Sequence, residues 1–190
     1  MSAEDANPAP LGLACFALTT FLLSTLNAGL SPQDTIGPIV SAALIYGGII
    51  QVMAGMWEIR KGSTFSGIAF SSYGGFWISL GLIFLLDSLR VWPVPASQGA
   101  IGVFLLAWTL FTFYLWVGTF RINKALMSTF ALLLLTFVLL DIGHLAGIAN
   151  ANVAGGYTGI LCALNAWYVS AAMLLNELFE RKILPLGQTD

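Results

Sequence analysis

The sequence predicts an all-α fold, a polytopic membrane protein with six transmembrane helices. Of its 190 residues, 58% are hydrophobic and 8% are charged, and the mean hydropathy is +0.88, whereas soluble domains have about 25% charged residues. The long stretches between charged residues contain 16 to 35 uncharged residues each. A helix crosses a bilayer with about 20 apolar residues, and the sequence lacks the short alternating segments typical of membrane β-barrels.

The spans are expected at residues 11–30, 37–57, 66–86, 99–119, 125–145 and 154–173, within one membrane domain over 1–190. Asn7 and the prolines at 8 and 10 predict the start of the first helix, because Asn is a favoured cap and Pro is tolerated in a first turn. The second span holds Gln51 at mid-membrane and ends at an interfacial Trp57. An interhelical hydrogen bond is the favoured role for Gln51, with substrate contact as the alternative.

The third span contains the run Ser71-Ser72-Tyr73-Gly74-Gly75. Small and hydroxyl residues have no use on a lipid-facing surface, so this run is expected to face protein or a water-lined path. Close helix packing and pore lining both remain open. The fourth span is rich in aromatic residues and is expected to face lipid or another subunit, because it offers few polar atoms beyond Thr109 and Thr112.

The fifth span is nearly all Leu and Phe from Lys124 until Asp141 and His144. Asp141 lies about 25 Å along the helix from Lys124 at 1.5 Å per residue, which places it near the outer end. His144 follows at i+3, on the same face. An ionisable residue at membrane depth indicates a function by default, but an interfacial pair in the outer headgroup region is the favoured interpretation of Asp141 and His144 at this point. The sixth span is rich in glycine.

Basic residues give the orientation. Six of the seven lie on the side that carries both termini, and Arg90 lies on the other, so both termini are expected in the cytoplasm of a protein in the inner (plasma) membrane. A net charge of −2 predicts no nucleic-acid partner. Cys15 and Cys162 both fall inside spans, which supports neither a disulfide framework nor a metal site. No cofactor is expected.

Four motifs carry a family resemblance: Asn7–Leu13 (Asn-Pro-Ala-Pro-Leu-Gly-Leu), Ala54–Glu58, Gly62–Phe65 and Ala69–Gly74. They resemble the acetate uptake transporter family, which includes the bacterial succinate–acetate permease and the yeast acetate permeases. The resemblance covers nearly the whole chain. It implies six helices around a pore within each protomer, a urea-channel-like arrangement, assembly as a homo-hexamer, and passage of acetate and often succinate.

The resemblance also implies an apolar constriction of one Phe, one Tyr and one Leu, which fall on Phe16, Tyr73 and Leu133, and a pore-lining position at Ala166. The three constriction residues lie 5, 7 and 8 residues into their predicted spans, so their depths agree within about 5 Å. One departure from the family is Asp141, where members carry a small or apolar residue, and members often carry an amide near His144. This departure points to proton coupling by Asp141 and His144.

The sequence therefore predicts passage of acetate, succinate or other small carboxylates, with anion channel and proton symporter both open. Hydrogen-bond donors for the carboxylate are expected from the start of the first helix and from polar residues along the path: Asn7, Asn27, Ser71, Ser72 and Tyr73. The alternative is a channel for neutral solutes such as urea, ammonia or water, which fits the fold and the neck equally well. An enzyme is not expected, because Asp141 and His144 alone make no catalytic set.

Overall fold

The computed structural model describes residues 6–91 and 97–187; the loop expected at 91–95 lies, apart from Val91, outside the described residues. All the regular elements in the described ranges are helices. The elements are α1 (Ala9–Asn27), the 3-10 turn η1 (Gln33–Thr35), α2 (Ile36–Leu44), the π-helical stretch η2 (Ile45–Ile50), α3 (Gln51–Arg60), α4 (Thr64–Ser88), α5 (Gln98–Thr119), α6 (Lys124–Leu145) and α7 (Ala149–Leu178).

Six helices are long and apolar enough to cross a membrane, which confirms the predicted fold class of a multi-pass all-α membrane protein. The second of them is a single span, Gln33–Arg60, that joins η1, α2, η2 and α3. α1 ends at Asn27 rather than at residue 30, because Gly29 adopts a φ of +71° that ends the helix. α7 extends beyond the predicted 154–173 at both ends, over residues 149–153 and 174–178, which include the polar residues Asn150, Asn152, Asn176 and Glu177.

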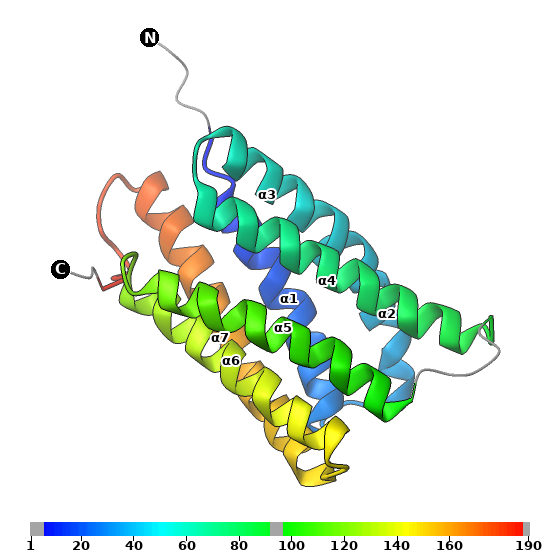
Figure 1. Cartoon of the computed structure of the whole chain (residues 1–190). Helices are drawn as coiled ribbons and strands as arrows, with labels where there is room; N and C mark the ends of the chain where they lie inside the picture. The colour runs from blue at the N-terminus through cyan, green and yellow to red at the C-terminus, as the bar shows by residue number, and fades with distance from the viewer. Residues whose placement is uncertain (1–5, 92–96, 188–190) are drawn as a thin grey trace.

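The helices run side by side (Figure 1), and their contacts close a ring. α1 packs against α7, α7 against α6, and α6 against α5; on the other side α1 packs against α3 and η2, and α3 packs against α4. α4 and α5 close the ring with few close backbone contacts. This arrangement leaves an interior that is bounded by all six spans.

Aromatic side chains fill the wider gap between α4 and α5. The ring of Phe76 stacks on Phe104, with centroids 5.7 Å apart, and meets Trp108 edge-on at 5.2 Å. Tyr73 meets Phe111 edge-on at 5.4 Å. Each such pair contributes about 0.5–1.5 kcal/mol beyond the area that it buries. The aromatic residues of α5 therefore divide between an interior face and an outer face, where Phe113 and Tyr114 are exposed.

Glycines hold α3 and α4 in close contact. A Cβ atom on Gly74 would lie 2.9 Å from the backbone nitrogen of Val52, and one on Gly55 would collide with the hydroxyl of Ser71. Small residues at helix interfaces allow this close approach in membranes. Part of the Ser-Ser-Tyr-Gly-Gly run therefore serves helix packing.

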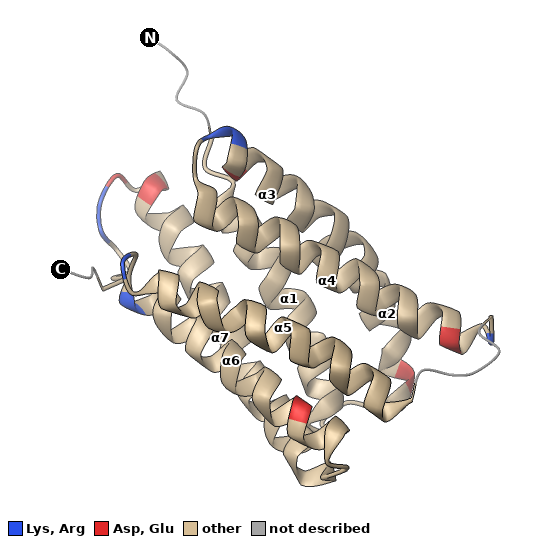
Figure 2. Ribbon diagram, viewed as in Figure 1, with Lys and Arg blue, Asp and Glu red and all other residues tan. Residues whose placement is uncertain are grey.

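The two ends of the ring differ in charge. Figure 2 shows most of the Lys and Arg at the end where both termini lie, while acidic residues occur at both ends. The structure thus brings the basic residues of three separate connections to one end: Arg60, Lys61, Arg121, Lys124, Arg181 and Lys182.

Candidate functional site

Two cavities lie in the interior of the helix ring, one toward each end. The first, of about 100 Å³, is lined at the end that carries the termini by Ala9, Asn123 and Met173; we call it the inner cavity. The second, of about 80 Å³, is lined at the opposite end by Asn27 and His144; we call it the outer cavity. Each has room for a few water molecules or one small solute.

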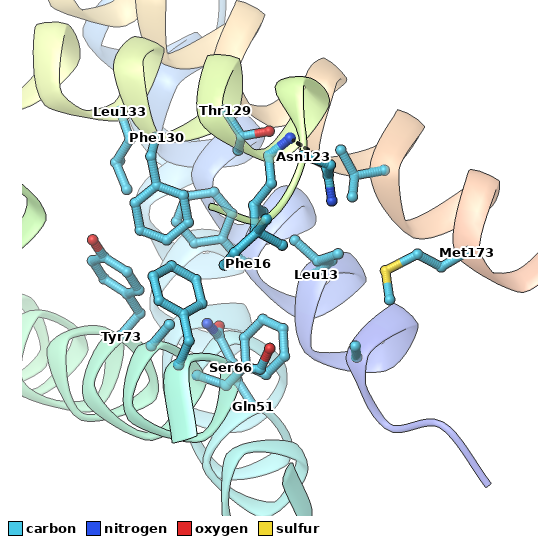
Figure 3. A pocket seen from close by; sticks show the side chains of 17 residues that line it. Leu13, Phe16, Gln51, Ser66, Tyr73, Asn123, Thr129, Phe130, Leu133 and Met173 are labelled. Carbon is cyan, nitrogen blue, oxygen red and sulfur yellow. Dashed lines mark hydrogen bonds between the residues drawn. The ribbon is translucent and has the colours of Figure 1, made fainter. Parts of the chain in front are cut away.

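The two cavities share three lining residues among those that the structure describes: Phe16, Tyr73 and Leu133. They come from α1, α4 and α6 and are all buried. The rings of Phe16 and Tyr73 lie 5.7 Å apart, and Figure 3 shows Phe16, Tyr73 and Leu133 at the inner cavity's wall. The structure thus brings the three residues expected at the constriction to the wall that the two cavities share, and we call them the neck.

A hydrogen bond fixes one wall of the neck. The Tyr73 hydroxyl lies 2.9 Å from Oγ1 of Thr112, and both residues are buried. Rings of Phe111 and Phe130 pack against the Tyr73 ring, with centroids at 5.4 and 6.2 Å. The hydroxyl is satisfied by α5, so Tyr73 presents its apolar ring to the neck. Thr112 therefore has a positioning role that the aromatic pattern of its span did not indicate.

Each cavity is lined by residues whose buried polar atoms have no hydrogen-bond partner among the described residues. In the inner cavity these are Nε2 and Oε1 of Gln51; in the outer cavity they are Oγ1 of Thr20 and Nε1 of Trp77. The sequence indicates Gln51 as an amide at mid-membrane, but no sequence pattern indicates Thr20 or Trp77. The remaining walls are mainly apolar and aromatic, so a solute meets few, isolated polar groups.

Several residues expected on the path line neither cavity. Ser72 is half-buried, and Ser71 lies in the α3–α4 contact described above. Ala166 is fully buried, in the same apolar cluster as Phe16 and Leu133. Asn7 precedes Pro8, the N-cap residue of α1, and its Oδ1 accepts a hydrogen bond from Ala9 N at 3.1 Å. Of the five expected donor residues, Asn27 and Tyr73 lie on a cavity wall. The Tyr73 hydroxyl is paired with Thr112 instead.

Asp141 and His144 point in different directions. His144 lines the outer cavity, and its Nδ1 lies 2.9 Å from the carbonyl oxygen of Leu140. A carbonyl only accepts, so Nδ1 carries the hydrogen and Nε2 is left for the cavity. Asp141 lines neither cavity; it is buried against α5, where Thr109 donates a hydrogen bond of 2.6 Å to its Oδ2. No group of three or more His, Cys, Asp and Glu that suits a metal ion occurs in 6–91 and 97–187.

Six membrane-crossing helices around two cavities that meet at an apolar neck define a membrane channel or transporter. The family follows from comparison with known proteins. The chain belongs to the GPR1/FUN34/yaaH family, whose model matches residues 1–186. This membership confirms the family resemblance that the sequence motifs predicted.

Three similar proteins illustrate the family. The succinate-acetate/proton symporter SatP of Escherichia coli (strain K12) is 41% identical over 184 residues, which cover 97% of this chain and 96% of SatP. The structure of the bacterial acetate channel SatP superposes with a TM-score of 0.92 at 40% identity, covering 97% of this chain and 100% of that one. The ammonia transport outward protein 2 of Saccharomyces cerevisiae is 43% identical over 168 residues, 86% of this chain and 59% of that protein.

Proposed function

We propose that this protein passes acetate, succinate and similar small carboxylates across the membrane through the inner cavity, the neck and the outer cavity. One observation carries the proposal: two cavities from opposite ends of the helix ring have Phe16, Tyr73 and Leu133 in common. The names of the similar symporter and channel support acetate as the substrate. The proposal makes the protein a transporter and not an enzyme.

The chemistry of the path suits a small carboxylate. Acetate has a methyl group that needs an apolar wall and a carboxyl group that needs hydrogen-bond partners. The neck supplies the wall, and Asn27 and Thr20 supply polar groups on the outer side. Removing water from an ionised carboxylate in an apolar neck is unfavourable, so passage favours a protonated acid or an anion that keeps polar contacts on both sides. Weak binding sites in series suit conduction.

The proposal includes orientation and assembly. The basic residues at the end that carries the termini support a cytoplasmic inner cavity. We propose a homo-hexamer with one path in each protomer, by resemblance to the acetate uptake transporters. The exposed apolar side chains on the outer face of α5, such as Leu110 and Phe113, suit contact with lipid or with a neighbouring subunit. Native mass spectrometry in detergent is expected to give six copies, and a monomer would contradict the assembly.

Competition experiments test the substrate. Purified protein in liposomes is expected to take up labelled acetate, and excess propionate is expected to reduce that uptake at least about tenfold while urea leaves it unchanged. The second candidate is a channel for neutral solutes, which the yeast relative named for ammonia transport favours. Ammonia or urea flux without acetate uptake would establish that candidate and reject the first.

A further inference from the structure

Gln51 is a fully buried amide in the wall of the inner cavity. It is the first residue of α3, directly after the π-helical stretch η2, and π-helical turns inside α-helices often mark functional sites. Its exposed fraction is 0%. Figure 3 shows its amide end directed into the cavity, among the aromatic rings that line it.

Neither the nitrogen nor the oxygen of this amide has a hydrogen-bond partner in the described parts of the chain. Polar side chains in membrane helices ordinarily bond across to a neighbouring helix, and the Asn165 amide does so, donating to Ala125 O and Thr129 Oγ1. The expectation of an interhelical bond from Gln51 is therefore not met in this structure. Because unpaired polar groups are costly to bury, the pair of free atoms points to a ligand.

The amide group selects between two forms of a carboxylic acid. A glutamine amide presents one donor and one acceptor side by side. The undissociated acid presents the complementary pair, an O–H donor and a C=O acceptor, so two parallel hydrogen bonds satisfy both amide atoms. The ionised carboxylate has acceptors alone, which leaves Oε1 of Gln51 unpaired and facing a negative charge.

We propose that Gln51 binds the undissociated form of the substrate acid, through two parallel hydrogen bonds, in the inner cavity. This inference rests on the proposed function and adds the chemical form of the substrate and the residue that selects it. Acetate takes up one proton from water on the loading side, the neutral acid crosses the neck, and on the far side it dissociates again to acetate and a proton. Substrate and proton move together, and no charge enters the apolar neck between Phe16 and Leu133.

Acetamide is the probe for this binding site. It has the shape of acetic acid, offers both a donor and an acceptor, and does not ionise. We expect acetamide to inhibit labelled acetate uptake by wild-type protein in liposomes, with the same potency at every pH. We also expect the apparent KM for total acetate to rise about tenfold for each pH unit above the pKa of the acid, because the protonated fraction falls by that factor.

The variant Gln51→Leu removes both hydrogen bonds at nearly constant volume. It is expected to raise the apparent KM for acetate at least about tenfold and to abolish inhibition by acetamide. Since the Gln51 amide has no protein partner, the thermal stability of the Gln51→Leu variant in detergent should match or exceed that of the wild type. Ser71→Ala is the matched control, because the buried Ser71 hydroxyl also lacks a partner but lines neither cavity; it should behave as wild type in both assays.

The outcomes separate this inference from the proposed function. Three results would overturn the role of Gln51 and leave acetate transport intact. They are an apparent KM for acetate that does not change with pH, an absence of acetamide inhibition in the wild type, and equal acetamide inhibition in Gln51→Leu. Absence of acetate uptake by the wild type would reject the proposed function itself.

Discussion

Replacing Leu133 with alanine is expected to raise the uptake of lactate and succinate at least about tenfold relative to acetate. Leu133 is shared by both cavities, so shortening its side chain widens the neck where they meet. A single methylene in an apolar site changes discrimination by about 10–200-fold, and this substitution removes three carbon atoms. Uptake of labelled acetate, lactate and succinate by proteoliposomes measures the change.

The same helix offers a matched control. Leu135 is 46% exposed on the outer face of α6, so Leu135→Ala makes the same chemical change away from the path and should leave selectivity unchanged. Phe16→Ala widens the neck from the opposite wall and should give the same shift as Leu133→Ala. If both neck variants fold, as judged by thermal stability in detergent, and keep the selectivity of the wild type, the three shared residues do not form the constriction.

The second large effect is expected for Asp141→Asn, which should flatten the pH dependence of acetate flux. We propose that Asp141 and His144 take part in proton coupling at the outer end. A protonated Asp141 is neutral, whereas an ionised one holds a negative charge at the outer end, in a region of low dielectric constant, and repels acetate anions before they take up a proton. Wild-type flux should therefore fall as the outside pH rises, and asparagine should remove that fall while keeping an oxygen for Thr109.

Two features of this experiment separate the effect of protein protonation on flux from the effect of substrate protonation. The total acetate is adjusted at each pH to hold the concentration of undissociated acid constant, so that protonation of the substrate does not contribute. Asp87→Asn is the control, because Asp87 is an exposed carboxylate near the end of α4 and its replacement should not change the profile. His144→Gln, on the wall of the outer cavity, should flatten the profile as well. A profile that neither variant changes would make both residues structural members of the interface.

The fold was largely predictable because long apolar stretches have few solutions in a membrane. The number of spans followed from the spacing of charged residues, and family membership followed from the motifs around Asn7 and Tyr73. Helix ends were less predictable. The left-handed conformation of Gly29 ends α1 early, and α7 continues beyond its apolar part into segments that contain polar residues. Hydropathy, from which the spans were predicted, reports neither effect.

The candidate site was predictable where a sequence motif identified the residue. It was less predictable where the rotation of a helix about its axis determines which side chains face a cavity. Residues three apart lie about 60° apart around a helix, which is enough to place His144 on a cavity wall and Asp141 against α5. Gln51 was visible as a mid-membrane amide, but an amide in a span equally suits helix packing. The contact of Ser71 with Gly55 depends on how α3 meets α4, which a single sequence does not contain.

Cysteine accessibility from each side of the membrane tests the central claim that the two cavities form one path interrupted at the neck. Ser66 lies on the inner cavity and Asn27 on the outer cavity, and both are half-buried. Single cysteines are placed at these positions in a background in which the fully buried Cys15 and Cys162 are replaced with alanine. A charged, membrane-impermeant thiol reagent is then applied from one face of oriented vesicles at a time, and labelled acetate uptake is measured.

The Ser66→Cys variant should lose acetate uptake when the reagent is applied from the cytoplasmic face alone, and Asn27→Cys should lose it from the opposite face alone. Added acetate should slow both reactions. Modification of both cysteines from the same face, or complete modification without loss of acetate uptake, would contradict a single substrate path through the neck of Phe16, Tyr73 and Leu133.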